Sequence, residues 1–139
     1  MKIKKYFILL LFSGMILGII NNIISFITYP LYADLNSQTH SLYFYIIMNF
    51  ILAFFFGSFI IAIYILIRNK MPGKGILKGI FYGVFIIWLF GPVFPFAYEL
   101  AFKLSVSKQT IIFLVSSFIT WIIYGIILEL FYSKVIIEK

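Results

Sequence analysis

Four apolar stretches dominate this sequence, and each is near the roughly 20 residues that a helix needs to cross the hydrocarbon core of a bilayer. They lie at residues 6–29, 42–67, 76–98 and 110–132. Only 11% of the 139 residues are charged, against about a quarter in a soluble domain. No stretch is left over for a soluble domain. The sequence therefore predicts an all-α membrane protein, a single domain (1–139) of four transmembrane helices in a compact bundle.

Basic residues are distributed unevenly between the two sides of such a bundle. Nine of the eleven lysines and arginines lie before the first stretch, between the second and third, or after the fourth. Only Lys103 and Lys108 lie on the other side. Because lysine and arginine in short loops stay in the cytoplasm, we expect a multi-pass protein of the plasma membrane with both termini cytoplasmic. These flanks explain the net charge of +7, so we expect the lipid bilayer as partner and no nucleic acid.

The third stretch contains Gly91, Pro92 and Pro95 within an otherwise apolar run. The fifteen residues before Gly91 are too few to cross a bilayer, so we expect the helix to continue through these residues with a kink. Proline lacks an amide hydrogen, and Pro92 would free the carbonyl of Trp88. A freed carbonyl in hydrocarbon needs a partner from another helix, a hydroxyl group or water.

Polar side chains inside the predicted spans gather at the depth of this kink. Asn22, Asn49 and Ser117 each lie about six or seven residues from the outer end of their span, which is about 10 Å at about 1.5 Å per residue. Two explanations fit: hydrogen bonds between helices, or a polar pocket open to the outside. The candidate pocket residues are Asn21, Asn22, Asn49, Pro92, Ser116, Ser117, Trp88 and Trp121. We expect the two tryptophans to fill helix contacts, with stacking on a bound ligand as the alternative.

Three titratable residues, Asp34, His40 and Glu99, lie at the predicted outer rim. Oxygen and nitrogen ligands of these types can hold a metal ion. Their spacing does not require one, and we expect these three residues to be solvated loop residues. We therefore expect no metal and no cofactor.

The sequence offers little for catalysis. It has no cysteine, and Ser116 and Ser117 have no histidine or lysine base within the predicted spans. Glu129 is shallow, near the inner end of the fourth span, where we expect it to snorkel or to pair with Lys134 or Lys78. We predict no catalytic residue and no enzymatic activity.

Small residues recur at a spacing of four in every span, as in Gly14 and Gly18, or Gly79 and Gly83. Such stripes let helices approach closely within one bundle, or form the face of a homo-oligomer. Residues 13–35 also align with 78–100, and 41–64 with 109–132, pairing Gly14 with Gly79 and Gly57 with Gly125. Both chance and a duplicated helical hairpin, giving two parallel repeats, explain this match.

Two functions are consistent with these features. The first is a small polytopic membrane protein without enzymatic activity, such as an accessory, immunity-type or scaffold protein. It would act through helix packing, as a homo-oligomer or in a larger membrane complex. The second is a small-solute transporter or channel that uses the polar pocket in the outer half of the bilayer. The sequence names neither a substrate nor a partner.

Overall fold

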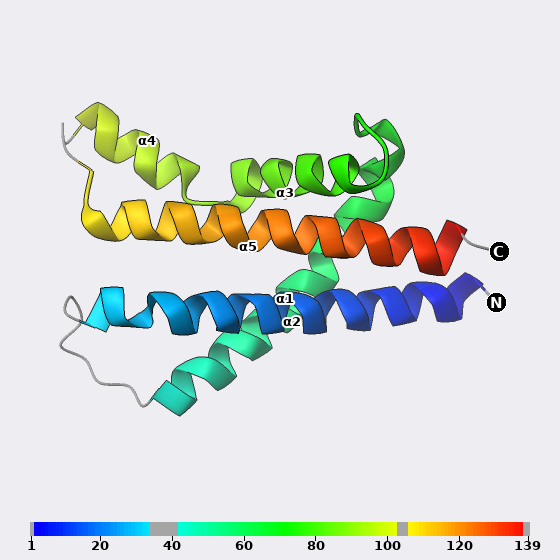
Figure 1. The fold of residues 1–139 in the computed structure, drawn as a ribbon, viewed down its shortest axis with the longest axis horizontal. Helices are drawn as coiled ribbons and strands as arrows, with labels where there is room; N and C mark the ends of the chain where they lie inside the picture. The colour runs from blue at the N-terminus through cyan, green and yellow to red at the C-terminus, as the bar shows by residue number, and fades with distance from the viewer. Residues whose placement is uncertain (1, 34–41, 103–105, 138–139) are drawn as a thin grey trace.

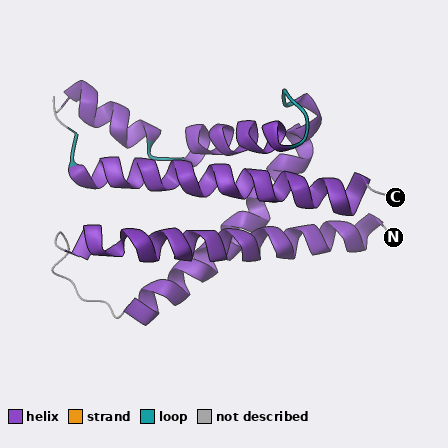
Figure 2. Ribbon diagram, viewed as in Figure 1, coloured by secondary structure: helices purple, strands orange, loops and turns teal. Residues whose placement is uncertain are grey.

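The computed structural model describes residues 2–33, 42–102 and 106–137, and nearly all of them are helical (Figure 2). Helix α1 spans Lys2–Ala33 and α2 spans Leu42–Ile67, followed by a 3₁₀ turn, η1, at Arg68–Lys70. Helix α3 spans Ile76–Phe90 and α4 spans Val93–Phe102. Helix α5 spans Lys108–Tyr132 and continues as a π-helical turn, η2, at Ser133–Ile137.

The helices alternate in direction along one long axis (Figure 1). α1 runs to one end, α2 returns obliquely behind it, α3 and α4 run out again, and α5 returns. The main contacts join α1 to α2 and α3 to α5, and α1 also packs on α5. Two helical hairpins therefore lie together, and α1 and α5 form much of the seam between them.

Three helical segments, Lys4–Thr28, Ile46–Lys70 and Lys108–Val135, are long and apolar enough to cross a membrane. The predicted helical bundle is thereby confirmed. α1 differs from the expected span because it continues through Pro30 to Ala33. The carbonyl that Pro30 frees lies near the end of this helix, where few backbone bonds remain to be lost.

The third predicted helix is broken, where we had expected a kink. α3 ends at Phe90, and Gly91 is extended with φ −84° and ψ 179°. Gly91 N–H donates to the Ile87 carbonyl at 2.8 Å, and the first bond of the new helix runs from Phe96 N–H to the Pro92 carbonyl at 3.0 Å. Pro95 thus lies in the first turn of α4, where an amide hydrogen has no partner within the helix. A restarted helix accommodates both prolines without an orphaned mid-helix carbonyl.

Within each hairpin, glycine allows the backbones to touch. A methyl group added at Gly57 would lie 3.0 Å from Gly14 Cα, and one added at Gly125 would overlap the Gly79 carbonyl oxygen. Close approach of this kind is how helices gain packing contacts in lipid, where no hydrophobic effect drives them together. The glycine stripes of the sequence therefore lie at helix contacts inside this chain.

The two hairpins are similar in kind but differ in register. Gly14 lies against the Phe54 carbonyl, whereas Gly79 lies against that of Gly125. The proposed alignment pairs Phe54 with Ile122, so the second contact is displaced by three residues, which is about one helical turn. A duplicated hairpin stays a prediction, since the glycines recur while the exact pairing does not.

The bundle has an apolar exterior and a partly polar interior. Large hydrophobic side chains are exposed along every helix, among them Phe7, Leu52, Phe81 and Phe113. The buried residues include Ser13, Thr120 and Glu129. Water as solvent favours the opposite arrangement. The structure is therefore built to place its apolar outer surface against another apolar phase.

We predict that Gly125→Ala weakens the contact between α3 and α5. The added methyl would overlap the Gly79 carbonyl oxygen, and overpacking of this kind costs about 1–3 kcal/mol. Unfolding in detergent micelles, followed by circular dichroism, should show a lower midpoint. Ala62→Val is the control, because Ala62 is exposed on α2 and its variant should unfold like the unaltered chain. An unchanged midpoint for Gly125→Ala would argue against this close contact.

Candidate functional site

The predicted polar level is a hydrogen-bonded group where it involves α1 and α2. Asn21 Nδ2 donates to Asn49 Oδ1 at 3.1 Å, and Asn49 Nδ2 donates to Ser25 Oγ at 2.9 Å. All three side chains are half-buried. Asn49 therefore ties α2 to α1 through both ends of its amide, which is the geometry of an interhelical hydrogen bond.

Asn22, the neighbouring asparagine, is not satisfied in this way. Its Oδ1 atom is buried and accepts no hydrogen bond in the part of the chain that the structure describes. A buried acceptor without a donor costs about 1–3 kcal/mol. Asn22 is thus the member of the polar level with capacity for another partner.

Two hydroxyl side chains of α5 at this level, Ser116 and Thr120, bond within their own helix. Ser116 Oγ donates to the Phe113 carbonyl at 3.1 Å, and Thr120 Oγ1 donates to the Ser116 carbonyl at 2.8 Å. Ser117 is buried. The polar level thus divides between the two hairpins, with the bonded asparagines on one and these hydroxyl groups on the other.

The two tryptophans differ from each other. Trp121 packs edge-to-face on Phe56, with ring centroids 5.9 Å apart, and on Tyr124 at 5.6 Å. It fills a helix contact, as expected. Trp88 is 60% exposed, so our expectation that it fills such a contact is wrong. It lies at the end of α3 among exposed apolar residues, while Pro92, just beyond the break, is buried.

Of the predicted outer rim, the structure describes Glu99 alone, because Asp34 and His40 lie outside the described residues. Glu99 Oε2 accepts a hydrogen bond from Ser107 N–H at 3.0 Å, and the Ser107 hydroxyl accepts one from Thr110 N–H at 3.1 Å. Glu99 therefore links α4 to the start of α5. Within residues 2–33, 42–102 and 106–137, no three candidate ligands from histidine, cysteine, aspartate or glutamate gather to hold a metal ion.

The sequence analysis missed a polar link in the middle of the bundle. Ser13 Oγ donates to the Gly57 carbonyl at 2.7 Å, and the Tyr124 hydroxyl is hydrogen-bonded to Ser13. Ser13 and Tyr124 are completely buried. The link joins α1, α2 and α5, one helix more than a simple pair. Each of these polar side chains directly precedes a glycine of a small-residue stripe, Gly14 or Gly125, and that position is the signal that could have identified them.

A second polar cluster lies at the end of the bundle that carries the η1 turn and is centred on Glu129, which is 1% exposed. Arg68 binds it with two bonds, Nη2 to Oε1 at 2.6 Å and Nε to Oε2 at 2.9 Å. The Tyr64 hydroxyl also donates to this carboxylate. The expected pairing of Glu129 with Lys134 or Lys78 is therefore wrong. An arginine fork bonds both carboxylate oxygens through two parallel N–H groups, a planar geometry that a lysine ammonium does not have.

Aromatic rings enclose this ion pair. The Arg68 guanidinium lies 4.6 Å from the centroid of the Tyr132 ring, and the Tyr64 ring packs on Tyr132 at 5.6 Å and on Tyr82 at 4.7 Å. The Tyr82 hydroxyl donates to the Ile60 carbonyl at 2.5 Å. The charges are thus paired, and the Tyr64 and Tyr82 hydroxyls donate to acceptors within the protein.

Lys78 completes the cluster by donating from Nζ to the Arg68 carbonyl at 3.1 Å. This bond draws the start of α3 toward η1, while the ion pair draws η1 to α5. The cluster therefore connects the hairpin of α1 and α2 to the hairpin of α3 and α5. Its carboxylate has every oxygen engaged by a donor, so it presents no free base for acid–base catalysis.

Comparison with known proteins finds no matching protein family, curated protein or solved structure. A functional argument must therefore come from the geometry of these polar clusters.

We predict strong coupling between Arg68 and Glu129. Arg68→Met leaves a buried carboxylate without its counter-charge and should cost about 3–5 kcal/mol of stability. Glu129→Gln keeps an acceptor for the Tyr64 hydroxyl and should cost less, because Arg68 retains some access to solvent. The double variant should be destabilised by less than the sum of the single variants. Unfolding of all four chains in one detergent measures this coupling, and strictly additive losses would contradict it.

Proposed function

We propose that this chain is a four-span integral membrane protein that acts through helix packing and protein interaction, as an accessory, immunity-type or scaffold protein, and not as an enzyme. The observation that carries the proposal is the use made of its interior polar groups. Ser13, Asn49 and Glu129 all bond to other helices of the same chain. Groups engaged in this way hold a bundle together and are not presented to a substrate.

Membrane insertion is supported by how little of the apolar helices is buried. In the three long segments, 33%, 28% and 28% of the most apolar window is buried inside the bundle. The remaining apolar surface would be costly in water. In lipid it is the surface that a spanning helix requires.

The third of the four proposed spans consists of α3 and α4 together. α3 has fifteen residues, or about 22 Å at about 1.5 Å per residue, which is short of a hydrocarbon core of about 30 Å. α4 continues in the same general direction beside α5 (Figure 1). Broken helices are found in membrane proteins where the freed backbone groups face protein and not lipid, and Pro92 at this break is buried.

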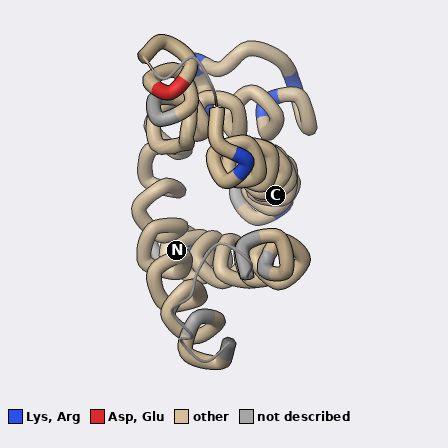
Figure 3. Tube along the Cα trace, turned by 90° about the vertical axis from the view of Figure 1, so that its left-hand side faces the viewer, with Lys and Arg blue, Asp and Glu red and all other residues tan. Residues whose placement is uncertain are grey.

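The orientation follows from the positions of the basic residues. Residues near both termini and the η1 turn lie at one end of the bundle (Figure 1). Lys4, Lys5, Lys74 and Lys134 are on segments at this end. Seen down the long axis, most of the chain carries no charge (Figure 3). By the positive-inside rule, this end is cytoplasmic in the plasma membrane.

A small-solute transporter or channel is the second candidate, and one specific observation favours it. Asn22 Oδ1 is a buried acceptor without a described donor. A solute that carries an N–H or O–H group would supply that donor at the outer polar level. The packing function, by contrast, includes contact with a second copy of this chain or with another membrane protein through exposed residues such as Trp88.

We predict that Asn49→Leu distinguishes the two functions. If the asparagines pack helices, this change removes two hydrogen bonds, each worth about 0.6 kcal/mol on average in a membrane protein, and lowers the unfolding midpoint in detergent. Proteoliposomes of the unaltered chain should then retain small ions and solutes as well as protein-free liposomes do.

The control is Met48→Leu, a volume-conserving change at the preceding, exposed residue. Its stability should match that of the unaltered chain. The opposite result would be a solute flux through the unaltered chain that changes in Asn49→Leu while the stability stays nearly the same. That result would overturn the packing function and support transport.

A further inference from the structure

A cavity of about 350 Å³ lies at the inner end, between the end of α2, the η1 turn and α3. Its lining is almost wholly apolar: Ile67, Lys70, Met71, Pro72, Phe81 and Phe85. Its volume is at the lower end of the range of small-molecule sites, about 300–1,000 Å³. No residue of the clusters described above lines it, so it is a separate feature of the molecule.

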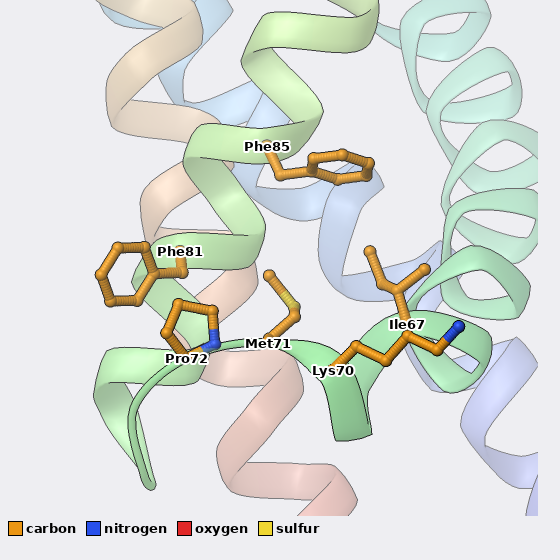
Figure 4. Close-up of a pocket in the computed structure, with 6 residues that line it drawn as sticks. All are labelled: Ile67, Lys70, Met71, Pro72, Phe81 and Phe85. Carbon is orange, nitrogen blue, oxygen red and sulfur yellow. The ribbon is translucent and has the colours of Figure 1, made fainter.

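The cavity combines one cation with a long apolar wall. In Figure 4, the Phe85 side chain extends from α3 toward Ile67 on α2, and Met71 points up into the space between these helices. Lys70 runs along the lower edge, beneath Ile67. The charge thus lies at one edge and the apolar side chains lie above it.

This polarity follows the depth of the residues in the proposed membrane. The second apolar segment ends at Lys70, so its ammonium group lies at the interface. Phe85 is nine residues beyond the start of α3 at Ile76, or about 13 Å deeper at about 1.5 Å per residue. A ligand with an anionic group at the interface and an apolar part of comparable length matches this arrangement.

The charges around the cavity favour an anion. The ion pair among the described residues joins Arg68 to Glu129, and Glu129 is fully used by it. Lys70 and Lys74 are exposed, and no described carboxylate forms a salt bridge with either of them. Clustered basic residues next to a cytoplasmic membrane face attract anionic headgroups.

We propose that this cavity binds an anionic phospholipid, with the phosphate at Lys70 and an acyl chain along Met71, Phe81 and Phe85. This inference rests on the proposed membrane insertion and cytoplasmic orientation. The bound lipid would cover the apolar gap between α2 and α3. The strongest helix contacts, those of α1 with α2 and of α3 with α5, lie within the hairpins. The bound lipid would add a connection between the two hairpins, at α2 and α3.

The test is lipid retention by the full chain. The protein is reconstituted in vesicles of equal phosphatidylglycerol and phosphatidylcholine, extracted in mild detergent, and analysed by native mass spectrometry. We expect phosphatidylglycerol to be retained about fivefold over phosphatidylcholine, the preference expected of one lysine near the headgroup. Lys70→Gln should reduce the ratio to near one. Met71→Trp, which places a larger side chain in the cavity, should reduce retention of both lipids.

Lys134→Gln is the matched control, because it removes an exposed lysine of the same end that does not line the cavity. It should leave the ratio unchanged. Equal retention of the two lipids by the unaltered chain would overturn the proposal. An equal loss in Lys134→Gln and Lys70→Gln would also overturn it, since the preference would then reflect surface charge alone. Displacement by soluble glycerol phosphate would show that the acyl chain is not required, and would overturn it as well.

A separate measurement tests the membrane insertion on which this site depends. Brominated phosphatidylcholine should quench part of the tryptophan fluorescence of the chain, the part that comes from the exposed Trp88. No quenching would overturn both the insertion and the lipid site. Quenching together with equal lipid retention would overturn the lipid site alone.

Discussion

The apolar outer surface of the helices is the constraint on which the rest of this structure depends. A helix whose exterior is as apolar as its interior gains nothing in lipid by burying more hydrophobic surface. The bundle must be held by other means, and two are present. Glycines bring the backbones of α1 and α2, and of α3 and α5, into direct contact. A few buried polar groups supply bonds that no lipid can replace.

These two means act at different places. The glycine contacts lie within hairpins, whereas two of the polar clusters join one hairpin to the other. Tyr124 on α5 bonds to Ser13 on α1, and Glu129 on α5 bonds to Arg68 after α2. α5 is therefore the helix that links the assembly. The asparagine group, by contrast, bonds α1 to α2 only. The unsatisfied acceptor at Asn22 lies beside this group, which joins only one pair of helices.

The sequence predicted the helices better than their pairing. The bounds of α2 agree with the predicted span, and the glycine stripes lie at contacts, because span length and small-residue spacing are local properties. The pairing of Arg68 with Glu129 joins residues 61 positions apart. Arg68 is the one arginine of the sequence, but nothing local shows which carboxylate it binds. Ser13 was missed for a similar reason, since a single hydroxyl in an apolar run carries no information on its partner. Apolar periodicity gave little help, because lipid-facing and core-facing positions are both apolar.

Gly91 and the prolines show a different limit. Composition located the irregularity, but whether the helix bends or restarts depends on the dihedral angles of one glycine. The position of Glu99 depends in turn on that choice, because the restarted α4 brings it to Ser107. The sequence thus predicted the depth of the polar level in the bundle. Its division between the two hairpins became visible only in the three-dimensional structure.

Cysteine labelling in sealed cells tests the central claim, that lipid surrounds this bundle with its basic end in the cytoplasm, most directly. The chain has no cysteine of its own, so Lys74→Cys and Lys108→Cys each introduce one exposed thiol. A membrane-impermeant maleimide should label the residue-108 thiol on intact cells and the residue-74 thiol only after the membrane is opened. Labelling of residue 74 from outside, or recovery of the intact chain as a water-soluble monomer, would contradict the account.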